Sequence, residues 1–190
     1  LVDEALYQAR IDRSLASATA RLDPSNPVSI ATHLIAARRD HAYTWDTGAI
    51  TVDALDAVWT QIDTWQDTRD FRLMYLHWVW ALADGSSPSR TLDPAVLAAI
   101  EQRMLDNRYQ WDDPLPEDRL DNLWFWSENH LIIGLVIEYL AGVRLADKTF
   151  TVTGLTGAEH AARPREPILE WVHERARFGF FEWHSHVYMK

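Results

Sequence analysis

The sequence contains no cysteine. The protein therefore has no disulfide bond, no thiol nucleophile and no cysteine-ligated metal. Glycine is also sparse, since only Gly48, Gly85 and Gly134 occur in the first 140 residues, and runs in which Val, Thr or Ile alternate with polar residues are few. Both features indicate helices rather than many short strands.

Basic residues are in the minority, because 18 Lys and Arg face 28 Asp and Glu, which gives a formal net charge of −10. Nucleic acids and anionic membrane surfaces bind basic faces, so neither is expected as a partner, although a local basic site for an acidic substrate stays compatible with this charge. The longest apolar run, residues 131–140, contains Glu138 and is too short to span a bilayer. The chain begins at Leu1 without a signal peptide, and we expect the mature or trimmed form of a secreted or periplasmic protein.

Tryptophan, in contrast, is abundant, with ten residues in a chain of 190. One interpretation is a core built from bulky side chains. The other is a cleft in which flat rings stack on the C–H faces of sugars. The sequence leaves both open.

Apolar residues at helical spacing and local start and stop signals predict an all-α protein. The expected helices are residues 3–22, 28–39, 51–66, 71–83, 94–107, 123–140 and 163–178. Asp70 is expected to cap the helix 71–83, and Gly142 and Gly179 are expected to end the helices 123–140 and 163–178. The segments 71–83 and 123–140 are apolar on most sides, and their neighbours are amphipathic. This alternation favours a double ring of inner and outer helices, with a plain bundle as the alternative.

The first cluster of candidate site residues follows Trp124 and Trp126. If Ser127 caps a helix that starts at Glu128, Asn129 and His130 lie in its first turn, where the free backbone N–H groups and the helix dipole suit a substrate carboxylate. The alternative is that both residues only complete the cap and a core hydrogen bond.

The second cluster is the aromatic and histidine-rich end of the chain. His184, His186 and Tyr188 face one way if the segment is extended. Two histidines suit zinc, but neither an HExxH pattern nor a third ligand accompanies them, so no metal site is predicted. Glu128 and Glu182 offer a pair of carboxylates for glycoside hydrolysis. Residues 159–160 are expected to be ordinary helix-start residues.

The run 127–130 (Ser-Glu-Asn-His) followed by Tyr188 resembles the heparinase and alginate-lyase group of polysaccharide lyases, over about residues 120–190. The resemblance implies an (α/α) toroid and β-elimination at a uronic acid without a cofactor. Asn129 and His130 would bind the uronate carboxylate and stabilise the developing enolate, and Tyr188 would move the proton. The side chains expected to bind the polysaccharide are Trp124, Trp126, Trp183, His184 and His186.

A six-hairpin toroid needs roughly twice this length. We therefore expect residues 1–190 to be the N-terminal portion of a single, incomplete toroid domain of helical hairpins. Its own C-terminal half or a second copy of the chain would complete it. Toroids also serve glycoside hydrolases, so hydrolysis by Glu128 and Glu182 and a non-catalytic, glycan-binding role remain alternatives.

Overall fold

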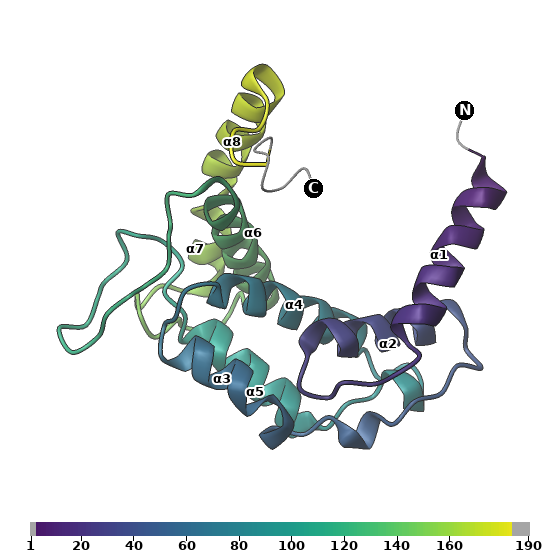
Figure 1. Ribbon diagram of the computed structural model, residues 1–190. Helices are drawn as coiled ribbons and strands as arrows, with labels where there is room; N and C mark the ends of the chain where they lie inside the picture. Colours follow the sequence, from purple (N-terminus) through teal and green to yellow (C-terminus); the bar gives the residue numbers. More distant parts are fainter. Residues whose placement is uncertain (1–2, 184–190) are drawn as a thin grey trace. The chain divides into compact units, whose positions relative to one another are not determined.

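A computed structural model describes residues 3–183, and within this range the protein is helical, with no strand and one isolated antiparallel bridge between Thr149 and Thr156 (Figure 1). The prediction of an all-α protein is confirmed; the toroid stays a prediction. The described residues form two compact units, one of residues 3–59 and 78–100 and the other of residues 60–77 and 101–183. No described helix is both long enough and apolar enough to cross a membrane.

The first unit begins with a helical hairpin. Helix α1 (Glu4–Ala18) is capped by the side chain of Asp3, and α2 (Pro27–Arg39) starts at a proline behind the Asn26 cap, where a missing N–H costs nothing. The two helices contact each other, and α2 buries its apolar face partly against the short 3-10 helix η3 (Pro88–Arg90). This unit also contains the 3-10 helices η1 (Thr47–Ala49) and η2 (Asp53–Leu55).

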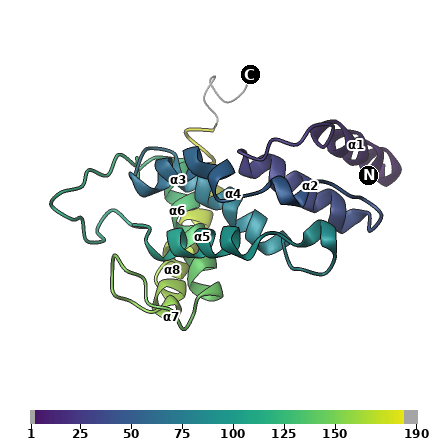
Figure 2. The ribbon, with the colours of Figure 1, turned by 90° about the horizontal axis from the view of Figure 1, so that it is seen from below.

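Three helices begin in one unit and end in the other: α3 (Asp56–Asp63), α4 (Arg69–Leu82) and α5 (Pro94–Leu105). The second unit also contains α6 (Glu128–Arg144), α7 (Gly157–Ala162) and α8 (Arg165–Phe178), and α6 packs against both α7 and α8 (Figure 2). Residues 106–127 form a long loop between α5 and α6 that extends away from the helices of this unit (Figure 1).

Gly142 does not end α6, as the sequence suggested, because the helix continues to Arg144. A Cβ atom at Gly142 would lie 2.4 Å from the backbone nitrogen of Ala161, and one at Gly157 would lie 2.1 Å from the carbonyl oxygen of Leu145. Both glycines are therefore needed for the close approach of α6 and α7. Helix α7 itself was not predicted; Thr156 and Glu159 form its capping box.

Other boundaries also differ from expectation. The predicted helix 51–66 is η2 followed by α3, and the predicted helix 71–83 starts at Arg69, so Asp70 lies inside the first turn instead of capping it. The predicted helix 123–140 starts at Glu128, behind the Ser127 cap.

A fully buried guanidinium group joins α4 to the loop 106–127. Arg69 forms two hydrogen bonds to the carboxylate of Asp121, at 2.6 and 2.9 Å. It also donates to the side-chain oxygen of Asn107 and the carbonyl of Arg108, each at 3.1 Å. Arg108 binds the same Asp121 carboxylate at 3.0 Å. A buried charge is tolerated only with such complete pairing.

Apolar side chains also remain exposed. On α1 these include Leu6 and Tyr7, and on α8 they include Leu169, Val172 and Phe178. Exposed apolar faces promote association, and the expected self-association of the chain stays a prediction.

Replacing Arg69 should strongly destabilise the protein, because Arg69→Met leaves several buried acceptors without a donor. We expect a loss of about 3–5 kcal/mol in the free energy of unfolding, measured with urea. The control is Arg38→Met on the exposed face of α2, for which a change within about 0.5 kcal/mol is expected. Equal effects of the two substitutions would contradict this role of Arg69.

His77 should make the protein sensitive to acid. Burial, followed by the charge of Arg144, lowers the pKa of His77 to about 4, whereas the unfolded chain binds this proton near pH 6.5. The contribution of His77 to stability is therefore complete above pH 6.5 and is lost as the pH falls toward 4, by about 3 kcal/mol in total. His77→Leu should remove this part of the acid dependence of urea unfolding, and the exposed control His173→Leu should retain it. An unchanged acid dependence in His77→Leu would exclude this explanation.

Candidate functional site

A cavity of about 310 Å³ in the second unit brings together several of the predicted site residues. Trp124, Asn129, His130 and Glu182 all line it, together with the Ser127 cap. The sequence did not predict the other three lining residues, which come from the turn before α4 and its first turn: Asp67, Thr68 and Phe71.

His130 is the best-positioned ionisable group of this cavity. Its Nδ1 atom lies 2.7 Å from Oδ2 of Asp70, and the ring of Phe71 meets the imidazole edge-on with centroids 5.4 Å apart. A carboxylate at Nδ1 holds the proton on that nitrogen and leaves Nε2 as the acceptor. Nε2 lies 3.8 Å from Oδ1 of Asp67, beyond hydrogen-bonding distance. The arrangement suits a proton acceptor with a fixed ring orientation.

Asp70 is almost fully buried, at 2 % exposure. Burial raises the pKa of Asp70 above its ordinary value, and the hydrogen bond and charge of His130 offset only part of this effect. Ionised Asp70 is therefore costly for the fold. A buried, perturbed carboxylate that orients a histidine at a cavity is typical of functional sites.

The turn that carries Asp67 is strained. Trp65 and Thr68 both have positive φ angles, of 51° and 63°, a conformation unfavourable for bulky and β-branched residues. Gln61 holds the turn by donating to the carbonyl of Asp67 at 2.8 Å and to the hydroxyl of Thr68 at 2.7 Å. The strain and these contacts together fix Asp67 near His130.

The start of α6 forms another part of the cavity wall. Ser127 is the N-cap, as predicted, and its hydroxyl donates to Oδ1 of Asn129 at 2.7 Å. The same Oδ1 atom accepts from the backbone N–H of His130 at 2.8 Å. A carboxylate oxygen of Glu182 lies 3.4 Å from the backbone nitrogen of Asn129. The helix start therefore holds a carboxylate, and this carboxylate belongs to the protein.

The carboxylate of Glu128 binds the backbone of the segment that follows α8. The same carboxylate is paired with Arg175 and accepts from the backbone N–H groups of Phe181 and Glu182. Burial by itself raises the pKa of Glu128, but these hydrogen bonds outweigh it and lower the pKa below its ordinary value. Glu128 stays ionised and only 6 % of its side chain is exposed, which suits a structural role better than that of a general acid.

The predicted aromatic residues lie in different surroundings. Trp124 and Trp126 are 56 % and 75 % exposed, with ring centroids 5.8 Å apart, and Trp124 borders the cavity. Trp183 instead stacks on Phe180, with centroids 4.8 Å apart, and contacts Trp171. This packing gives Trp183 a structural role within the aromatic cluster.

His184, His186 and Tyr188 lie outside the described residues. Within residues 3–183, no group of three or more His, Asp or Glu side chains is arranged to hold a metal ion. His160, expected to be an ordinary helix-start residue, is fully buried and lies 2.7 Å from Glu138 and 2.7 Å from Thr153.

The two acidic partners of His130 were missed for a physical reason. Asp70 carries the ordinary signal of a helix cap, and its true partner is 60 positions away in the sequence. One signal was available: Asp67 and Asp70 are spaced by three residues immediately before an apolar helix, so both side chains are brought to the same end of α4.

Comparison with known proteins gives no relative. No family model, curated protein or solved structure matches the chain.

Ionised Asp70 should lower the free energy of unfolding, because its carboxylate is buried. Because its folded-state pKa is raised, its contribution is fully present below the unfolded pKa of about 4 and is lost as the pH rises through the folded-state value. The uncharged variant Asp70→Asn should therefore gain stability relative to the wild type between pH 4 and pH 7, measured by urea unfolding. The exposed control Asp147→Asn should show no such trend. A relative loss for Asp70→Asn with rising pH would mean that ionised Asp70 supports the fold.

Proposed function

We propose that the protein is a carbohydrate-active acid–base enzyme in which His130 accepts a proton and Asp70 positions its ring. The observation that carries this proposal is the 2.7 Å contact between His130 Nδ1 and the buried Asp70 carboxylate at the edge of a cavity. The exposed ring of Trp124 at the same cavity supports a sugar as the ligand, because aromatic planes suit the C–H faces of sugar rings.

The reaction proposed first is β-elimination at a uronic acid of a polysaccharide. His130 Nε2 takes the C5 proton, the C5–H electron pair forms the C4–C5 double bond, and the C4–O bond breaks. The leaving oxygen receives a proton from Tyr188 or from water. The side chain of Asn129 and its backbone N–H group at the start of α6 stabilise the charge that develops on the uronate carboxylate.

The position of Glu182 supports a carboxylate-binding role for the start of α6. Its own carboxylate lies at the backbone nitrogen of Asn129, where helix N-termini favour anions. A substrate carboxylate would replace Glu182 at this place. Binding then requires the Glu182 side chain to move away from the backbone N–H of Asn129.

Glycoside hydrolysis is the second candidate, because carboxylates of Asp67 and Glu182 line the same cavity. The pair suggested by the sequence was Glu128 with Glu182. Since Glu128 is ion-paired with Arg175 and nearly buried, a hydrolase would use Glu182 with Asp67 instead.

The two reactions give different products, and single substitutions show which residues the reaction needs. The protein is incubated with a panel of uronate-containing and neutral polysaccharides, and the near-ultraviolet absorbance of unsaturated sugars is followed beside the release of reducing ends. We expect absorbance on a uronate polysaccharide and a loss of about 100-fold or more in kcat for His130→Gln. Asp70→Asn should lower kcat and change the pH profile, and the exposed control His173→Gln should retain activity.

The same assay shows whether the proposed reaction, the proposed proton acceptor or catalysis itself is wrong. Reducing ends without absorbance, lost in Glu182→Gln, would replace elimination by hydrolysis. Turnover that survives in His130→Gln but not in Tyr188→Phe would move the proton-accepting role to Tyr188. No product on any substrate would exclude catalysis on these polysaccharides and favour a glycan-binding role.

A further inference from the structure

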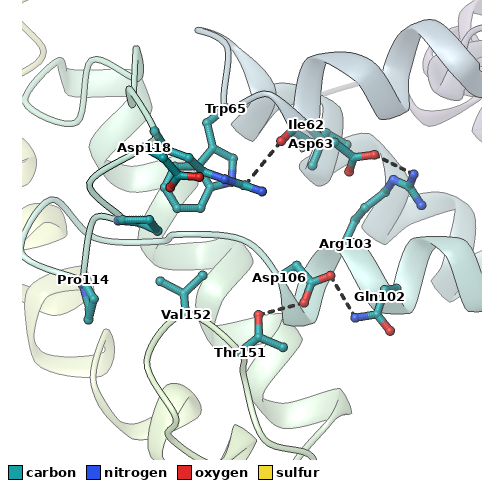
Figure 3. Close-up of a pocket in the computed structure, with 12 residues that line it drawn as sticks. Ile62, Asp63, Trp65, Gln102, Arg103, Asp106, Pro114, Asp118, Thr151 and Val152 are labelled. Atoms are coloured by element: carbon teal, nitrogen blue, oxygen red, sulfur yellow. Dashed lines mark hydrogen bonds and ion pairs between the residues drawn. The ribbon is translucent and has the colours of Figure 1, made fainter.

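A larger cavity, of about 640 Å³, lies elsewhere in the second unit and has no lining residue in common with the His130 cavity (Figure 3). Its walls come from the ends of α3 and α5, from the loop 106–127 and from residues 151–152. The volume falls within the range of small-molecule sites, about 300–1,000 Å³. Nothing in the proposed reaction uses this cavity.

The polar wall of this cavity is cross-linked between separate segments. Arg103 pairs with Asp63 at 2.8 Å, which joins α5 to α3. Asp106 accepts from the hydroxyl of Thr151 at 2.7 Å and from the side-chain amide of Gln102 at 2.8 Å (Figure 3). The hydrogen-bonding groups are therefore held in place before a ligand arrives, which lowers the entropic cost of binding.

A second wall is apolar, and its largest side chain is the ring of Trp65. The guanidinium group of Arg119 lies 5.0 Å from the centre of this ring and within 3.5 Å of the carbonyl oxygen of Asp63. Ile62 and Val152 add aliphatic surface to the lining (Figure 3). The cavity thus combines a hydrogen-bonding wall with an apolar one.

The charges of the lining exclude most ligand classes. The carboxylates of Asp63, Asp106 and Asp118 face the guanidinium groups of Arg103 and Arg119. A phosphate or another anion would meet an excess of carboxylates. A compact cation would have to compete with Arg103, Thr151 and Gln102 for the carboxylates of Asp63 and Asp106.

A neutral ligand with many hydroxyl groups is not repelled by the carboxylates, and it need not displace their present partners, because each carboxylate oxygen can accept more than one hydrogen bond. Hydroxyl groups accept from Arg and Gln side chains and donate to carboxylates, so each polar group of the wall finds a partner. The C–H faces of such a ligand lie against the apolar wall. We propose that this cavity binds a neutral polyhydroxylated ligand, of the size of a short segment of a neutral oligosaccharide. The proposal does not rest on the reaction at His130.

Binding of neutral oligosaccharides tests this site directly. Cellopentaose, maltopentaose and mannopentaose are titrated into the isotope-labelled protein, and the backbone amide signals are followed by NMR, with a uronate pentamer and inorganic phosphate as charged probes. We expect one of the neutral sugars to shift the amides of residues 62–65, 102–106 and 118–119. Asp106→Asn and Asp118→Ala should each weaken its binding by about 10-fold, since a hydrogen bond to a charged group is lost.

Two control variants separate this site from the His130 cavity. His130→Gln should bind the same sugar unchanged, and so should Asp147→Asn, which replaces an exposed carboxylate outside the cavity. Binding of only the uronate or phosphate would overturn the assigned ligand class. Neutral-sugar binding that is lost in His130→Gln, binding that Asp106→Asn and Asp118→Ala both leave unchanged, or no binding of the three neutral sugars would overturn the site.

Discussion

The buried ion pair between Arg69 and Asp121 is the interaction on which the second unit depends. A guanidinium group without solvent is tolerable only when its planar set of donors is matched by acceptors, and Arg69 has Asp121, Asn107 and the carbonyl of Arg108 within hydrogen-bonding distance. The two partners are 52 positions apart in the sequence. Their contact therefore fixes the start of α4 against a long loop that has no secondary structure of its own to hold it.

The lining of both cavities depends on the ion pair between Arg69 and Asp121. Arg69 directly follows the strained turn of residues 65–68, and it also lies 3.4 Å from the carbonyl oxygen of Trp65. Asp67 and Thr68 of this turn line the cavity of His130, and Trp65 of the same turn lines the larger cavity, where its ring contacts Arg119. The left-handed conformations of Trp65 and Thr68 cost about 1–3 kcal/mol each and persist only because the surrounding contacts hold them. The strain is thus located in the turn that lines both cavities.

Local chemistry explains what the sequence could predict. The helix class, the Ser127 cap, the proline start of α5 and the end of α8 at Gly179 all depend on neighbouring residues. The cap placed Asn129 and His130 correctly in the first turn of α6.

The contacts that the sequence could not predict join residues far apart in the chain. Asp70 was assigned as a cap because His130 is far away in the sequence, and Glu128 was assigned a chemical role because Arg175, its partner, lies 47 positions later. Gly142 was predicted to end α6, but a glycine is needed at this position because the backbone of α7 approaches it closely.

One buried ion pair, between Arg69 and Asp121, holds the turn of residues 65–68 and the loop 106–127 together. Hydrogen exchange at the backbone amides of Asp121→Asn tests it most directly, because this substitution removes the charge while it keeps the shape of the side chain. We expect exchange to accelerate together in residues 64–70 and in residues 106–127, while the amides of α2, in the other unit, keep the exchange rates of the wild type. Faster exchange in the loop alone, with the turn unchanged, would contradict the claim and would mean that α4 and its preceding turn are held by other contacts.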